Sequence, residues 1–200
     1  MHILKEDYFC GCRISPMPET PDNSCRHPLT GGFMVKRWHW IGAGLVLLLS
    51  VPLHFIHDWI GDLFFLAWFF PVNESIWEHL KLLATPMLAL SIPAYFLYGK
   101  NFPNFLPVRL LSILSGMAGI IVSFYTYTGI LGTHFLFADG MTLVMGVFIA
   151  YWFSDHFLHS TRFSSGNARF QAQAGFLVLI IAFILFTWYP PDLALFTPWR

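Results

Sequence analysis

Five long apolar segments constrain the fold of this chain more than any other feature of its sequence. A membrane-spanning helix needs about 20 mostly apolar residues. Four of the segments meet that length, and the fifth is shorter but dense in Leu, Ile and Phe. Backbone polar groups in lipid must be satisfied within the protein, so only helices and closed barrels span membranes. The sequence therefore predicts an all-α, polytopic integral membrane helical bundle, with helices at residues 38–57, 76–98, 108–129, 135–153 and 175–189.

An apolar stretch at residues 59–71 is rich in Trp and Phe but too short to span a bilayer. Aromatic side chains are enriched at membrane–water interfaces, so we expect a short interfacial or re-entrant segment here. Residues 34–200 are expected to form a single membrane-embedded domain, and residues 1–33 a flexible tail in front of it.

All the cysteines of the chain lie in this tail. Thiolates and imidazoles suit zinc, so a small zinc site is one interpretation of the tail. A disordered tail is preferred, because the spacing does not match the usual zinc patterns. The residues concerned are Cys10, Cys12, Cys25 and His27.

Charged residues are scarce and unevenly placed. They make up 11% of the chain, whereas about 25% is usual in soluble domains, and the formal net charge is zero. A nucleic-acid partner is excluded because the basic stripe it needs is absent. The connections after the first and third predicted helices contain no Lys or Arg, whereas the others are flanked by basic residues. The positive-inside rule then predicts a multi-pass protein of the cell membrane with its N-terminus in the cytoplasm and its C-terminus outside.

A polar run at the start of the second predicted helix is the strongest functional signal. It places Glu74, Glu78, His79 and Lys81 at the mouth of an apolar helix. Placing ionisable side chains within a membrane-spanning segment costs free energy, so they mark a functional site by default. Starting the helix near residue 73 gives Glu74, Glu78 and Lys81 a common face. The structural alternative is a buried Glu78–Lys81 ion pair that holds helices together.

Other predicted helices bring polar residues to the same outer side. Two histidines three residues apart end the first helix, a tyrosine ends the third, and a histidine and an aspartate lie near the start of the fourth. Histidines with a carboxylate form common zinc sites, so we expect an outer-leaflet polar cavity with zinc as its possible cofactor. The predicted metal ligands are His54, His57, His79, His134 and Asp139, and the predicted catalytic residues are Glu74, Glu78, Lys81 and Tyr127.

Two strings resemble a known family. Residues 72–81 contain Val-Asn-Glu-Ser-x-Trp-Glu-His-Leu-Lys, and residues 124–132 are also similar. They resemble a bacterial family of small polytopic membrane proteins of unknown function. The resemblance covers about residues 38–160, and implies a protein of the bacterial inner membrane but no activity.

Three functions remain open from the sequence. The first, slightly preferred because histidines and carboxylates converge from several helices, is a metal-dependent membrane hydrolase acting on a lipid or other amphiphile. Glu78 or Glu74 would be its general base, and Tyr127 or Lys81 would stabilise the oxyanion; the absence of an H-E-x-x-H motif counts against it. The second is an ion-coupled carrier in which Glu74, Glu78 and Lys81 titrate, acting as a homo-oligomer because five spans are few for a transporter. The third is a non-catalytic subunit that binds a partner membrane protein or is held together by a structural ion-pair network.

Overall fold

The structure, a computed structural model, describes the backbone of residues 28–60 and 66–198 and the side chains of residues 35–55 and 67–198. Within these residues the chain is all-helical and contains no strand. Each of the long helices is long and apolar enough to cross a membrane, which confirms the predicted fold class. The elements are α1 (Pro28–Ile60), η1 (Leu66–Trp68), α2 (Ile76–Leu97), η2 (Gly99–Asn101), α3 (Phe105–Leu131), α4 (Leu136–Leu158) and α5 (Gly166–Trp188).

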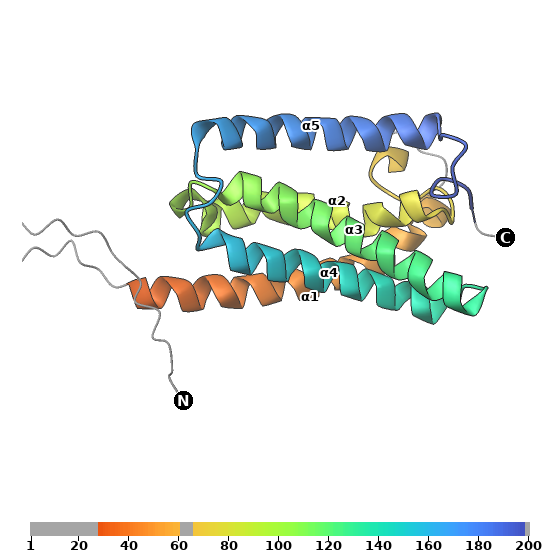
Figure 1. Ribbon diagram of the computed structural model, residues 1–200, viewed down its shortest axis with the longest axis horizontal. Helices are drawn as coiled ribbons and strands as arrows, with labels where there is room; N and C mark the ends of the chain where they lie inside the picture. Colours follow the sequence, from red (N-terminus) through yellow and green to blue (C-terminus); the bar gives the residue numbers. More distant parts are fainter. Residues whose placement is uncertain (1–27, 61–65, 199–200) are drawn as a thin grey trace, which may run out of the picture.

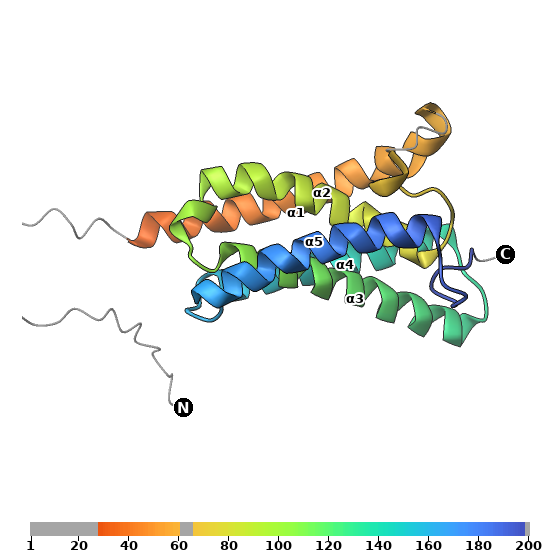
Figure 2. The same ribbon diagram turned by 90° about the horizontal axis from the view of Figure 1, so that it is seen from above.

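The five long helices lie roughly parallel to one long axis and alternate in direction (Figure 1). Helices α2 and α3 lie between α5 on one side and α1 and α4 on the other. The view from above places α1 and α2 on one side of α5 and α3 and α4 on the other (Figure 2). We call the end at which α1, α3 and α5 finish and α2 and α4 begin the site end, on the right of Figure 1.

The core is built from apolar side chains of all five long helices. Leu80, Leu83 and Ile113 are fully buried in its centre. Gly116 of α3 and Gly146 of α4 let these two helices approach closely, because a Cβ atom added at Gly116 would lie 2.7 Å from the carbonyl oxygen of Gly146. Helices α3 and α4 therefore form a closely packed pair, and the other helices of the site end pack against it.

The start of α2 differs from the expectation. Ser75 caps the helix by accepting a hydrogen bond from the Glu78 N–H at 3.4 Å, and Asn73 accepts one from the Ser75 N–H at 2.9 Å. The helix thus begins at Ile76, and Glu74 precedes its cap. The expected common face of Glu74, Glu78 and Lys81 is wrong, because Glu74 does not follow the helical period.

Several other boundaries move outward. Helix α1 runs beyond residues 38–57 at both ends. Helix α5 begins at Gly166 rather than at residue 175, and its first turns were missed because they are polar. In the stretch predicted to be interfacial or re-entrant, α1 continues to Ile60 and η1 follows. The tail for which a zinc site was the less favoured interpretation, with Cys10, Cys12, Cys25 and His27, lies outside the described residues.

Candidate functional site

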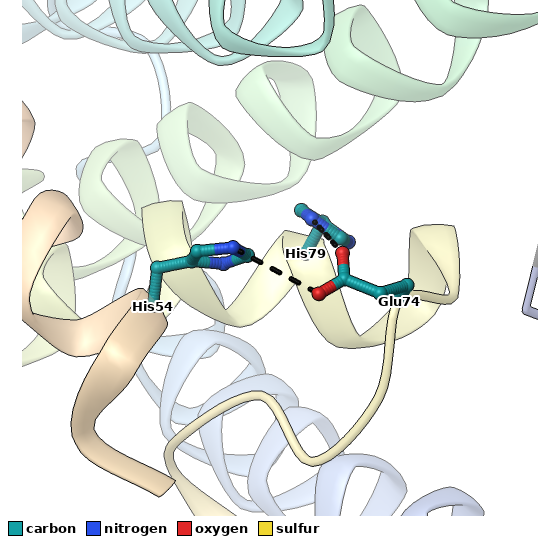
Figure 3. A group of neighbouring side chains, drawn as sticks. All are labelled: His54, Glu74 and His79. Carbon is teal, nitrogen blue, oxygen red and sulfur yellow. Dashed lines mark ion pairs between the residues drawn. The ribbon is translucent and has the colours of Figure 1, made fainter. Parts of the chain in front are cut away.

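Three separate segments bring two imidazoles and one carboxylate together at the site end. His54 comes from α1, Glu74 from the loop before α2, and His79 from the first turn of α2. The three side chains point toward one another (Figure 3). The Nε2 atom of His79 lies 3.3 Å from one carboxylate oxygen of Glu74, and the Nε2 atom of His54 lies 3.9 Å from the other. The imidazole rings are 5.4 Å apart between centroids.

The local backbone orients His79. Its Nδ1 atom lies 2.9 Å from the Ser75 carbonyl oxygen, which can only accept a hydrogen bond, so Nδ1 carries the proton and donates it. The lone pair of the neutral ring is then on Nε2, the atom that faces Glu74. A hydrogen bond of this kind, made by the ring nitrogen that does not bind the metal, fixes the tautomer of metal-binding histidines. Ser75 therefore caps α2 with its side chain and orients His79 with its carbonyl.

The spacing of these atoms suits a metal ion. One ligand atom from each of His54, Glu74 and His79 lies within 4.8 Å of the others. A tetrahedral ion with ligand bonds of about 2.1 Å separates its ligand atoms by roughly 3.4 Å. The observed separations of 3.3 Å and 3.9 Å are close to that value, but they end on different oxygens of the Glu74 carboxylate. Binding of one ion through a single carboxylate oxygen would therefore require side-chain rotation.

A cavity of about 250 Å³ adjoins this cluster and lies between α1, α2, α3 and α4. Most of its wall is apolar, and Asp139 and Thr142 of α4 add polar atoms. Besides the three clustered residues, the lining includes Val51, Phe55, Leu82, Ile120, Phe124 and Leu143.

Asp139 belongs to a second polar cluster on α3 and α4. The hydroxyl of Tyr127 donates a hydrogen bond to one oxygen of Asp139, and Nδ1 of His134 lies 3.1 Å from the other. The structure thus joins three predicted site residues to one another. Of the three, only Asp139 lines the cavity. His134 and Tyr127 therefore affect the cavity only through their contacts with this carboxylate.

Glu78 and Lys81 face away from the cavity. Their side chains are 2% and 0% exposed and form an ion pair of 2.7 Å. The Lys81 ammonium also donates to the Ala67 carbonyl at 2.8 Å and to the Thr187 hydroxyl of α5 at 2.6 Å. Glu78 accepts from the Val72 N–H at 3.0 Å. This closed network ties α2 to α5 and to η1, which is the arrangement expected of the structural alternative.

The predicted ligand His57 lies on α1, but its side chain is outside the described residues. Thr187 is a participant that the sequence did not suggest, because a single hydroxyl in an apolar helix carries no signal by spacing. The apolar residues that line the cavity could not be identified from the sequence either. Their residue types are those of any helix core, and only the fold shows which of them line a space.

The chain belongs to a protein family whose activity is not known. The model of the Family of unknown function (DUF6512) matches residues 32–198, which includes all five long helices apart from the first residues of α1. No curated protein and no solved structure matches the chain. Family membership therefore supports a membrane protein of unknown function, and the chemistry has to be argued from the site.

Proposed function

We propose that this member of the family binds one zinc ion through His54, Glu74 and His79 and uses it to hydrolyse an amphiphile. The convergence of three ligand atoms within 4.8 Å, at the edge of an apolar cavity, carries the proposal. Catalytic zinc sites typically combine three protein ligands with an open position for water, and two histidines with one glutamate are an established set. A structural zinc site would need a fourth protein ligand.

The cavity supports an amphiphilic substrate. Its volume of about 250 Å³ lies just below the range of roughly 300–1,000 Å³ that is usual for small-molecule sites. An apolar wall of this size fits a slender chain better than a bulky polar molecule. The protein lies among lipids, so substrates with an acyl chain are at hand in the membrane.

The residues around the cavity can divide the chemistry of ester or amide hydrolysis. Zinc brings the pKa of a bound water to about 7. Glu74 would be occupied as a ligand, so Asp139 is the carboxylate that lines the cavity and can take the proton of that water. The ion would supply the activated water that attacks the carbonyl carbon, and Asp139 would return the proton to the departing alcohol or amine. Tyr127, which donates to Asp139 but does not line the cavity, would hold that carboxylate in position.

Metal analysis of purified full-length protein tests the binding step. We expect about one zinc ion per chain after loading and dialysis, and loss of that ion in His54→Ala, Glu74→Ala and His79→Ala. His156→Ala, an exposed histidine of α4 at the opposite end of the bundle, is the matched control and should keep the ion. Wild-type protein that retains no zinc, or ligand variants that retain it fully, would overturn the proposal.

Asp139→Asn separates catalysis from binding. With fluorogenic acyl esters of increasing chain length, wild-type protein should be active only with zinc. Asp139→Asn should keep the ion and lose at least about a hundredfold in kcat, which is the lower bound for a general base. If zinc-loaded protein hydrolyses neither esters nor amides, the proposed metal site stands but the proposed hydrolase activity is refuted.

The geometry gives the carrier hypothesis less support. A titrating carrier needs Glu78 and Lys81 to exchange protons with water, but both are buried and hydrogen-bonded to each other. The predicted orientation, with the site end outside the cell, remains a proposal drawn from the positions of Lys and Arg.

A further inference from the structure

A second polar site lies at the opposite end of the bundle, and it centres on a buried arginine. Arg109, one turn into α3, is 2% exposed. Its Nε atom donates to the Ser91 hydroxyl at 2.7 Å, and Nη2 lies 3.5 Å from the Tyr151 hydroxyl. The guanidinium also lies over the Tyr151 ring, 5.2 Å from its centroid.

Within the described part of the chain, the positive charge of Arg109 has no acidic partner. No carboxylate pairs with it among the described residues, and its buried Nη1 atom has no hydrogen-bond partner in the same part of the chain. Burying an unpaired charge is strongly unfavourable. Aromatic and hydroxyl contacts offset only part of that penalty, so the arrangement indicates an anion that completes the site.

A cavity of about 90 Å³ adjoins this guanidinium. At about 30 Å³ for each water, the space holds roughly three waters, or one small anionic group. Tyr98 lines the same cavity. Burial raises the pKa of Tyr98, so its hydroxyl remains a donor at neutral pH.

The surroundings of the cavity indicate where the anion comes from. The other walls are apolar side chains of α1 and α2, and Trp38, Ile41 and Leu97 among them are also exposed on the outer surface of the helices. In a membrane that surface contacts acyl chains. Lys36 and Lys100, both exposed, lie at the same end of the bundle. Basic side chains at the headgroup level attract anionic lipids.

We propose that Arg109, with Tyr98 and Tyr151, forms a binding site for the phosphate group of an anionic lipid whose chains lie along α1 and α2. Arginine suits this role because its planar fork matches phosphate oxygens and is more weakly hydrated than an ammonium. The site is separate from the His54–Glu74–His79 cluster and does not depend on the function proposed for it.

Native mass spectrometry of full-length protein in detergent tests the site. Delipidated wild-type protein is titrated with phosphatidylglycerol and with phosphatidylcholine of the same chains, and inorganic phosphate is a third arm. We expect one phosphatidylglycerol to bind at least about tenfold more tightly than phosphatidylcholine, since charge-assisted hydrogen bonds are the strong ones. Arg109→Gln should remove that preference, whereas Arg162→Gln, which removes an exposed charge near the same end of the bundle, should keep it.

The outcomes are decisive even if Arg109→Gln fails to fold. Equal affinity of the wild-type protein for the two lipids would overturn the proposal without any variant. A preference that survives in Arg109→Gln would also overturn it. Inorganic phosphate that stabilises the protein against heat as much as phosphatidylglycerol does would show a site for a free anion and refute the lipid. Competition between phosphate and phosphatidylglycerol, with the lipid the tighter ligand, would support it.

Discussion

The buried ion pair between Glu78 and Lys81 gives the sharpest test of how this bundle is held together. All three ammonium protons of Lys81 are used, on Glu78, on the Ala67 carbonyl and on the Thr187 hydroxyl. Lys81→Met removes the charge and leaves the Glu78 carboxylate in place, 1% exposed. Removing one partner of a buried pair costs about 3–5 kcal/mol, because the remaining charge is uncompensated. We expect a loss of that size in the free energy of unfolding.

The double variant Glu78→Leu/Lys81→Met separates charge from packing. Replacing a buried pair by apolar side chains of similar volume is often neutral or stabilising. Here the Val72 N–H and the Ala67 carbonyl would each lose a partner, at about 1 kcal/mol per hydrogen bond. The double variant should therefore lose only about 2 kcal/mol, less than Lys81→Met alone.

Unfolding in mixed detergent micelles, followed by circular dichroism as the denaturing detergent is raised, measures these differences. Lys100→Met removes an exposed lysine at the other end of the bundle and should change the unfolding free energy by less than about 0.5 kcal/mol. A double variant destabilised as much as Lys81→Met, or more, would refute the reasoning. So would a loss below about 1 kcal/mol in Lys81→Met.

Three further changes test other parts of the structure. Gly146→Ala should lower the free energy of unfolding by about 1–3 kcal/mol, since its Cβ would lie 2.9 Å from the Gly116 carbonyl oxygen; Gly140→Ala, where a Cβ meets nothing, is the control in the same unfolding assay. Asn104→Ala removes a side chain that donates to the carbonyls of Phe157 and Ser160, and should lower the free energy of unfolding by about 1–3 kcal/mol. The melting temperature should fall accordingly, and a value equal to that of wild type would contradict this. Tyr127→Phe should leave the zinc content unchanged and lower kcat, and loss of zinc in this variant would place Tyr127 in metal binding instead.

The sequence predicted the helices well because their signal is local. A run of about 20 apolar residues identifies a spanning helix without knowledge of its neighbours. The ends were less accurate where polar residues continue a helix beyond the apolar core, as in the first turns of α5 after Gly166. Length and hydropathy do not register such turns, and a cap such as Ser165 is the only sequence signal for them.

The site was predicted in part, for a different physical reason. The polar residues were correctly identified as unusual, but their grouping depends on where α2 begins. Glu74 lies outside the helix and turns toward His79 and His54, whereas Glu78 and Lys81 turn toward α5. A shift of about three residues in the helix start, from residue 73 to Ile76, thus divides one expected face into two sites. Arg109, near the start of the third predicted helix, is one of the basic residues from which only the topology was predicted. A charged residue within an apolar segment is itself a functional signal.

The three clustered side chains come from two helices and the loop that joins them, and this origin has a mechanical consequence. A metal ion bound to His54, Glu74 and His79 would link α1 to α2 across their connection, in addition to the hydrogen bonds that Val72 and Ala67 of this connection make with α2. An ion that binds only the folded state stabilises it by about 2.7 kcal/mol at a hundred times its dissociation constant. Chelation would then loosen α1 from α2 first and leave the α3–α4 pair, joined at Gly116 and Gly146, in place.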